Sequence, residues 1–198
     1  MAKGQRSLSK YDLPQVCAHR YFDISEDNYG VAVITDSKYG YGIQNGEINL
    51  SLLRASTYPD KNADKGVHSF RYAIYVHDGF ENSNVERIAY LYNNPPIARS
   101  VKNPTGDLPS AYSFVKVDKD NVVVDTVKKA ESAEGYILRL YESKNRRTNC
   151  EITLAVPYTK VAFCDLMENE EIVLETSNTN TLKLMIKPFE IVTLKVSC

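Results

Sequence analysis

The sequence predicts an all-β protein, an antiparallel β-sandwich, and three observations support this fold class. Short tracts rich in β-branched and aromatic residues recur along most of the chain. Gly, Asp, Asn and Pro residues, which are typical of turns, separate these tracts. Where polarity alternates clearly, the period is two, as expected of a strand with one face in a core. Such a pattern is typical of antiparallel sheets packed face to face, as one sandwich or as two packed sub-sandwiches.

The first strand group spans residues 16–94 and follows an N-terminal extension at residues 1–15. Its predicted strands are residues 16–24, 30–35, 47–54 and 67–77. Alternation is clearest in the third tract, where Ile48, Leu50 and Leu52 share one side and polar residues occupy the other.

One short helix is predicted near residues 84–93, at the end of this group. Ser83 and Glu86 have the spacing of a capping box. Apolar residues then recur at helical spacing. The helix is expected to end at Asn94, because two prolines follow.

A proline-rich segment, residues 95–109, is the predicted crossover or linker to a second strand group. That group spans residues 110–198, and we expect it to pack with the first group as one β-sandwich domain. Its predicted strands are residues 111–117, 122–128, 135–141, 150–156, 161–166, 181–186 and 189–196.

Composition and charge limit the classes of partner. The 198 residues are 43% hydrophobic and 25% charged, with a formal net charge of -1. These values are typical of a soluble globular protein and leave no broad positive field for a nucleic-acid backbone. No apolar run has the length of a membrane span. We therefore expect no nucleic-acid partner and no membrane partner.

The cysteines bear on the cellular compartment. Cys17, Cys150, Cys164 and Cys198 lie far apart and form no C-x-x-C pair, so neither a zinc site nor a redox motif is predicted. The first three fall in apolar tracts, where a free thiol behaves as a small hydrophobic group. No apolar signal-peptide core precedes them. These observations favour reduced thiols and a cytoplasmic protein.

Two loop motifs are similar to ligand-binding loops but fit turns better. Residues 40–46 have one residue too many for a phosphate loop and precede a strand, so hairpin turns are predicted, with Asn45 and Gly46 as the two-residue connection. Residues 60–66 begin like a calcium loop, but Lys65 and Arg71 occupy the positions that need Gly and a bidentate acid. A polar surface loop is predicted there.

No residue is predicted to be catalytic or to ligate a metal. His68 and His77 would point to opposite faces of one strand, and His19 lies in another. No Gly-x-Ser-x-Gly elbow is present. Cysteine–histidine chemistry stays open on spacing, although no cysteine has a signal of activation. Five acidic residues fall near predicted strand ends or in loops, where they normally solvate turns: Asp23, Glu26, Asp36, Asp60 and Asp64.

A series of short motifs follows in order from about Val16 to the end of the chain. They are Val-Cys-Ala-His-Arg at 16–20, Asp-Ile-Ser-Glu at 23–26, Tyr-Gly-Val-Ala at 29–32, Asp-Ser-Lys-Tyr-Gly at 36–40, Leu-Ser-Leu-Leu-Arg at 50–54 and Phe-Arg-Tyr-Ala-Ile-Tyr at 70–75, with continuations at 124–131, 135–142 and 188–191. In this order they resemble the C-terminal β-sandwich domain of the α-mannosidases of glycoside hydrolase family 38.

The resemblance implies that this chain is part of a longer enzyme. Family members have an N-terminal α/β domain with a zinc ion and an aspartate nucleophile, then a helical bundle and C-terminal β-sandwich domains. The implied reaction is retaining hydrolysis of terminal α-mannosides. We therefore expect the catalytic nucleophile, and zinc or another divalent metal, in the full-length parent. This chain alone is expected to be inactive and to hold no cofactor. Its expected partners are the remaining domains of the parent and a mannoside or oligosaccharide substrate.

The resemblance also implies one substrate-binding residue, Arg54. In related mannosidases the leucine strand before it delivers an arginine towards the substrate cleft, and a guanidinium has five donors for sugar hydroxyls. The alternative interpretation is an arginine that closes a strand with its head in water.

A free-standing carbohydrate-binding β-sandwich module is the alternative function. The chain has 14 tyrosines and no tryptophan. A tyrosine ring can stack on a pyranose ring, and five tyrosines are candidates for this role: Tyr39, Tyr41, Tyr58, Tyr72 and Tyr75. A third hypothesis is a structural domain that contacts missing segments, which predicts an uncovered apolar patch.

Overall fold

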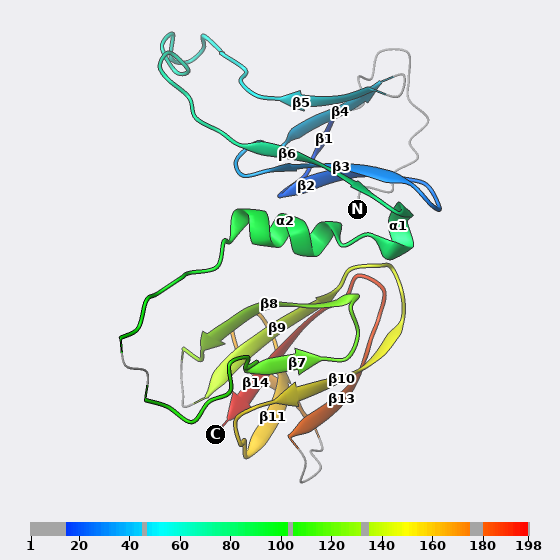
Figure 1. Ribbon diagram of the computed structural model, residues 1–198, viewed down its shortest axis with the longest axis vertical. Helices are drawn as coiled ribbons and strands as arrows, with labels where there is room; N and C mark the ends of the chain where they lie inside the picture. Colours follow the sequence, from blue (N-terminus) through cyan, green and yellow to red (C-terminus); the bar gives the residue numbers. More distant parts are fainter. Residues whose placement is uncertain (1–14, 45–46, 103–104, 132–134, 175–179, 198) are drawn as a thin grey trace. The chain divides into compact units, whose positions relative to one another are not determined.

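The structure is a computed structural model, and it describes residues 15–44, 47–102, 105–131, 135–174 and 180–197 (Figure 1). The chain divides into two compact units, which we call unit 1 (Met1–Ser100) and unit 2 (Val101–Cys198). The boundary falls inside the proline-rich segment 95–109. The packing of both strand groups as one sandwich stays a prediction.

The predicted all-β fold class is confirmed. In the described residues fourteen strands form four sheets, and every strand pairing among them is antiparallel. Two helices accompany them, α1 (Gly79–Asn82) and α2 (Val85–Asn93). The longer helix, α2, is the one that the sequence predicts.

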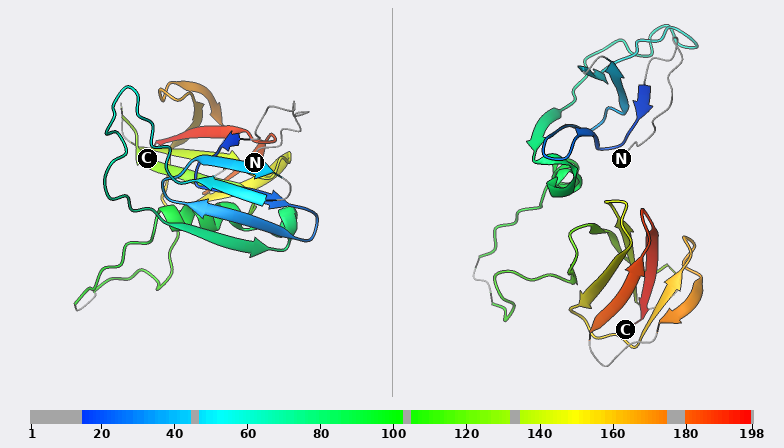
Figure 2. Two further views of the ribbon diagram at one scale, coloured as in Figure 1. Left: turned by 90° about the horizontal axis from the view of Figure 1, so that it is seen from above. Right: turned by 90° about the vertical axis from the view of Figure 1, so that its right-hand side faces the viewer.

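Unit 1 contains two three-stranded sheets, with strand orders β2-β3-β6 and β1-β4-β5. The first consists of β2 (Tyr21–Ser25), β3 (Gly30–Thr35) and β6 (Tyr72–His77), and the second of β1 (Gln15–Cys17), β4 (Gly40–Gln44) and β5 (Glu47–Ser51). Figure 2 shows both sheets from two further directions.

The central strand β3 is buried on both of its faces, which explains its run of apolar residues. Ala32 and Ile34 lie on the face against which α2 packs. On the other face Val33 joins Phe22 and Tyr41 in the buried cluster between the two sheets. The rings of Phe22 and Tyr41 stack with their centroids 5.2 Å apart. A strand covered on both faces has little room for polar residues.

Helix α2 begins one residue later than the capping-box prediction. Asn84 is the N-cap, without a side-chain cap hydrogen bond, and the Ser83 hydroxyl donates to the carbonyl of Phe80. The predicted end is confirmed, since Asn94 caps the helix and its backbone N–H donates to Tyr90. The helix also holds β3, because the Asn93 side chain donates to the carbonyl of Thr35 at 3.1 Å.

Unit 2 is a sandwich of a five-stranded and a three-stranded sheet, with orders β12-β11-β14-β9-β8 and β13-β10-β7. The larger sheet consists of β8 (Val122–Lys129), β9 (Tyr136–Glu142), β11 (Lys160–Cys164), β12 (Glu170–Leu174) and β14 (Ile191–Ser197). The smaller one consists of β7 (Val115–Val117), β10 (Thr148–Leu154) and β13 (Thr181–Ile186).

The core of unit 2 lies between these sheets. Alternate residues of β9 and β14, such as Leu138 and Leu194, face alternate residues of β10 and β13, such as Ile152 and Leu184. Fourteen buried residues form this one cluster. Burial of roughly 1.5–3 kcal/mol per large apolar side chain makes this core a main source of the stability of unit 2.

Several predicted strand boundaries are wrong. The tract 16–24 is two strands, because Arg20 adopts a left-handed backbone (φ +68°) between β1 and β2. The third tract ends at Ser51, three residues before Arg54, and the fourth begins at Tyr72 instead of Val67.

Two strands and one helix are absent from the prediction. Residues 40–44, for which the sequence predicts hairpin turns, form strand β4, which pairs with both β1 and β5. Residues Asn45 and Gly46, the predicted connection, lie outside the described residues. Strand β12 was missed because Glu170 and Glu171 interrupt its apolar pattern. Helix α1 is a single turn.

Candidate functional site

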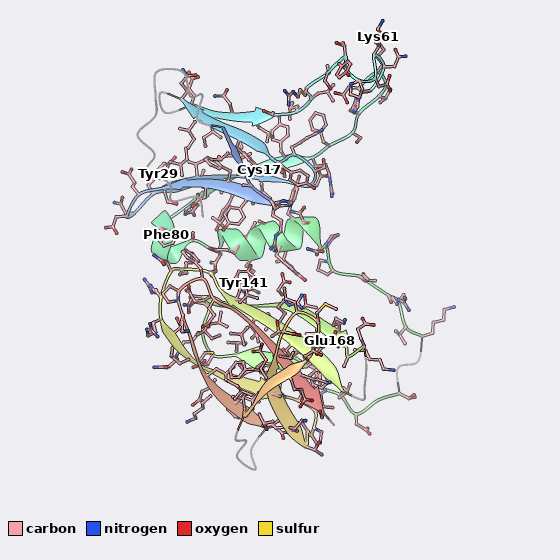
Figure 3. All side chains as sticks on the ribbon, turned by 180° about the vertical axis from the view of Figure 1, so that it is seen from behind. Cys17, Tyr29, Lys61, Phe80, Tyr141 and Glu168 are labelled. Carbon is pink, nitrogen blue, oxygen red and sulfur yellow. The ribbon has the colours of Figure 1, made fainter. Side chains whose placement is uncertain are left out.

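The candidate site is the loop from Leu52 to Arg71, which we call the Arg54 loop. It joins β5 to β6 without a helix or strand of its own and extends away from both sheets of unit 1 (Figures 1 and 2). Figure 3 shows Lys61 near the tip of this loop. Loops of this length inside a compact unit are uncommon and are usually functional.

An ion pair fixes the returning end of the Arg54 loop. Asp36, just after β3, accepts hydrogen bonds from the backbone N–H and the Nε of Arg71, at 3.1 and 3.0 Å. These bonds, that from the backbone N–H first and that from the guanidinium next, hold the pKa of Asp36 below its ordinary value. The Arg71 guanidinium also lies 5.4 Å from the ring centroid of Tyr92 on α2. The loop is therefore anchored to two elements of unit 1.

A hydrogen bond inside the Arg54 loop joins Ala55 to Asp64. The backbone N–H of Ala55 donates to Oδ2 of Asp64 at 2.7 Å. Ala55 has a left-handed backbone, φ +54°, which costs a residue other than glycine about 1–2 kcal/mol. Nε2 of His68 lies 3.0 Å from the backbone carbonyl oxygen of Asp64. These contacts hold the turn that immediately follows Arg54.

The side chain of Arg54 has no partner among the described residues. It is exposed, and no hydrogen bond, ion pair or ring contact joins it to the described part of the chain. Its five N–H donors are therefore available to hydroxyl or carboxylate oxygens. A fixed turn next to an unpartnered guanidinium is an arrangement that can bind a polar ligand with little rearrangement of the backbone.

The structure corrects the prediction that Asp23 solvates a turn. Asp23 lies inside β2, where its Oδ1 is 2.8 Å from Nε2 of His77 and its Oδ2 accepts a hydrogen bond from Ser25. Nδ1 of His77 is 3.0 Å from the carbonyl oxygen of Gly79. Both ring nitrogens of His77 therefore lie within hydrogen-bond distance of an oxygen atom, one from a side chain and one from the backbone. This pair is satisfied internally and presents no reactive atom to a ligand.

Gly30 provides the space for that ring. A Cβ atom at position 30 would lie 2.1 Å from Cε1 of His77. The sequence motif Tyr29-Gly30-Val31-Ala32 therefore has a packing reason, since a side chain there would displace the buried imidazole.

The histidines and cysteines do not gather into a metal site. The ring of His19 lies against that of Tyr39, with the centroids 4.7 Å apart and the planes tilted by 32°. His68 lies in the Arg54 loop, not on the strand of His77 as predicted. In the described parts of the chain, no three His, Cys, Asp or Glu side chains are grouped so that they could hold a metal ion. The thiols of Cys17, Cys150 and Cys164 are free, and Cys198 lies outside the described residues.

The loop prediction for residues 60–66 is confirmed as a polar surface loop. The Asp60 carboxylate accepts a hydrogen bond from the backbone N–H of Asn62 at 2.8 Å, which is a local turn. No described helix has the length and apolarity required to cross a membrane.

The five tyrosines differ in exposure. Tyr41 is buried and its hydroxyl lies 3.1 Å from that of Thr35, so it cannot stack on a sugar. Burial raises the pKa of the Tyr41 hydroxyl. Tyr75 is half-buried beside His77. Tyr39, Tyr58 and Tyr72 are exposed, and Tyr58 belongs to the Arg54 loop.

Comparisons with family models identify the chain. Residues 121–194 match the glycosyl hydrolases family 38 C-terminal beta sandwich domain, and residues 2–62 match the glycosyl hydrolases family 38 C-terminal domain. The chain belongs to the C-terminal domains of glycosyl hydrolase family 38. Among curated relatives, this family 38 chain is 37% identical to Alpha-mannosidase 2C1 of Homo sapiens over 91% of its length, and 34% identical to Alpha-mannosidase G of Dictyostelium discoideum over 91%.

The family 38 chain spans about a fifth of the length of those relatives, 18% and 17% respectively. A solved structure titled as an alpha-mannosidase from Enterococcus faecalis V583 has the same fold, with a TM-score of 0.75 and 18% identity. The likeness covers 94% of this chain and 21% of that one. The predicted resemblance and fold class are thus confirmed, whereas the role of Arg54 stays a prediction.

Proposed function

We propose that this chain is the C-terminal part of a retaining α-mannosidase, in which it serves as scaffold and as one wall of the substrate cleft. The observation that supports this function is the match to alpha-mannosidases over 89–92% of the chain and only 17–19% of their own lengths. The catalytic nucleophile and the metal then belong to the preceding polypeptide.

The contribution of this chain to the reaction is positioning. In a retaining glycosidase two carboxyl groups about 5–5.5 Å apart form and hydrolyse a glycosyl-enzyme intermediate. A divalent metal would polarise or orient sugar hydroxyls. The described residues offer no ligand set for that metal. Arg54 would donate to sugar hydroxyls, and the Asp64–Ala55 bond would keep it in place.

The test compares the 198-residue chain with the full reading frame that encodes it. We expect the longer protein to hydrolyse an aryl α-mannoside and the isolated chain to show no turnover. Hydrolysis by the isolated chain would contradict the proposal that the catalytic groups lie on the preceding polypeptide. A reading frame that ends at these 198 residues would contradict the whole proposal.

A carbohydrate-binding module is the second candidate function, and one observation favours it. Tyr58 is 88% exposed and lies four residues from the unpartnered Arg54, so the same loop presents a ring and a guanidinium. This combination suits a pyranose ring and its hydroxyls. Calorimetric titration of the isolated chain with mannose oligosaccharides separates the candidates, since millimolar or tighter binding that Tyr58→Ala abolishes would favour the module.

We also propose a cytoplasmic location. The free thiols of Cys17, Cys150 and Cys164 support it, because unpaired cysteines persist in reducing compartments. Fractionation of the native cells, with detection of the full-length protein, is the direct check.

A further inference from the structure

Strand β6 presents a row of apolar side chains to solvent, which we call the β6 row. Tyr72, Ile74 and Val76 alternate along the strand and are 56%, 69% and 57% exposed. They share one face, because side chains two residues apart on a strand point the same way. The two intervening residues, Ala73 and Tyr75, point to the other face and are half-buried.

The second sheet of unit 1 covers this face at Val33 and Phe22 but not at the β6 row. In the strand register Ile74 lies opposite Val33 on β3, and Val33 lies opposite Phe22 on β2. Val33 and Phe22 are buried with Tyr41 of the β1-β4-β5 sheet. Exposure therefore changes sharply across a single step in the sheet, from 9% at Val33 to 69% at Ile74.

The outer edge of β6 is also unprotected. β6 pairs with β3 on one side and with no described strand on the other. Its sequence contains no Lys and no Pro, and its one ionisable group besides two tyrosines, His77, is buried against Asp23. Edge strands that stay in solvent normally carry such charges or prolines, which prevent further strand pairing.

Strand β12 of unit 2 is the useful contrast. It is also an edge strand with an exposed isoleucine, Ile172, at 62%. Glu170 and Glu171 precede that residue, and Glu170 forms an ion pair with Lys160. This edge has the charged protection that β6 lacks.

The two units also differ in the size of their buried apolar clusters. The main buried apolar cluster of unit 2 has fourteen residues, whereas that of the described part of unit 1 has three. Counted over all described residues, unit 1 has seven buried hydrophobic side chains and unit 2 has eighteen. Further apolar contacts would stabilise unit 1.

We propose that the β6 row is an interface, covered in the intact protein by an extended apolar segment of the polypeptide N-terminal to these family 38 domains. This inference rests on the proposed function. The matched models are C-terminal domains by description, and about four-fifths of each mannosidase relative lies outside the match. A strand added at the free edge of β6 would satisfy its backbone groups and bury Ile74 and Val76 together.

The test is Ile74→Lys in the isolated chain and in the full-length protein, with Ile172→Lys as the matched control. In the full-length protein we expect Ile74→Lys to lower the melting temperature by at least about 5 °C, because it places a charge in an apolar contact. The same change should shift the isolated chain by less than about 1 °C, since the residue is exposed there. Ile172→Lys should leave the melting temperatures of both proteins unchanged. Equal losses for both variants in the full-length protein would overturn the interface.

Hydrogen exchange gives a second readout that does not depend on activity. Amides of β6 should be protected in the full-length protein and exchange faster in the isolated chain. Equal exchange in the two proteins would contradict the proposal even if the full-length protein cleaves mannosides. Conversely, a full-length protein without mannosidase activity but with protected β6 amides would reject the proposed function and retain the interface.

A second copy of the chain is the competing occupant of the β6 row. Sedimentation of the isolated chain tests it directly. If the isolated chain is a dimer, and Ile74→Lys dissociates it whereas Ile172→Lys does not, the β6 row is a site of self-association. That result would overturn the proposal. A monomer at concentrations up to about 100 μM would support the N-terminal occupant.

Discussion

Arg54 is the residue whose surroundings most clearly indicate a ligand outside this chain. Its guanidinium has no partner among the described residues, while the next residue is held in a left-handed backbone by Asp64. Strained positions persist where neighbouring contacts enforce them, and they cluster at functional sites. Asp64, which holds this turn, therefore belongs to the candidate site together with Arg54.

Arg54→Ala in the full-length enzyme is expected to lower kcat/KM at least tenfold, which corresponds to about 1.4 kcal/mol of lost transition-state stabilisation. The melting temperature should stay the same, because the side chain is exposed and forms no hydrogen bond or ion pair with a described residue. Arg54→Lys should recover only part of the activity, since an ammonium lacks the planar fork of donors. Arg99→Ala, at an exposed arginine of the proline-rich segment, is the control. Unchanged turnover of Arg54→Ala would reject the role.

Asp64→Ala is expected to lower kcat/KM about fivefold in the full-length enzyme, because it removes the acceptor of the Ala55 N–H, a bond of roughly 1 kcal/mol. Asp64→Asn keeps a carbonyl oxygen and should restore most of the activity. If Asp64 acts through Arg54, adding Asp64→Ala to Arg54→Ala should cause no further loss. Additive losses in steady-state kinetics would show that the two residues act independently. Asp60→Ala, which removes a local turn bond, is the control.

At the scale of elements, buried polar groups fix how strands connect. In unit 2 the carboxylate of Glu142, at the end of β9, accepts hydrogen bonds from Asn121 at 2.8 Å, from the Lys144 N–H at 2.7 Å and from the Phe189 N–H at 3.0 Å. These residues belong to three different connections of the sandwich. One buried carboxylate thus holds the ends of several strands together.

Glu142 should make the stability of unit 2 dependent on pH. Burial raises the pKa of this carboxyl group, but the backbone N–H of Phe189, the Asn121 amide and further donors outweigh burial and hold the pKa below its ordinary value of 4.5. A lowered pKa in the folded state means that the ionised form stabilises the fold above about pH 4.5. That stabilisation is lost as the pH falls through the lower, folded-state pKa.

Glu142→Gln is expected to reduce the free energy of unfolding at pH 7 by about 1.5–3 kcal/mol, the range for hydrogen bonds to a charged group. The variant should also show a shallower loss of stability between pH 5 and 3, measured by urea denaturation at each pH. Glu171→Gln, at an exposed glutamate, should preserve both the stability and the slope. If Glu142→Gln lost stability with falling pH as steeply as the wild type, Glu142 would not be the group responsible for this pH dependence.

At the scale of the whole molecule, the described residues of each unit form a main buried cluster of their own. Each unit has its own sheets and its own buried cluster, and the residues described between α2 and β7 form no helix or strand. Separate clusters favour separate cooperative units.

We therefore expect the isolated chain to unfold in two steps. Leu194→Ala, in the core of unit 2, should destabilise one transition by about 2–5 kcal/mol, and Phe22→Ala, in the cluster of unit 1, should lower the other. Denaturant titration followed by hydrogen exchange would assign each transition to its unit. A single transition that both variants lower would show that the units unfold together.

Much of the fold could be predicted from short-range patterns. The β5 alternation is confirmed for Ile48 and Leu50, which pack on the cluster of unit 1. The two prolines after Asn94 correctly locate the end of α2. β4 was missed because its Gly-Tyr-Gly sequence has low strand propensity, and its partners β1 and β5 supply the pairing. The uncovered apolar patch of the third hypothesis stays a prediction, which the exposed side chains of the β6 row support.

The sequence by itself determined the all-β class, the end of the helix and the family, because each depends on residue order and on periodicity within a few positions. Tertiary structure alone decided that Asp23 meets His77 across 54 positions and that Asp64 closes the turn after Arg54. It also decided that Ile74 is exposed while Val33 is buried. Contacts between distant residues depend on strand register and on what covers each face, which local propensity does not encode.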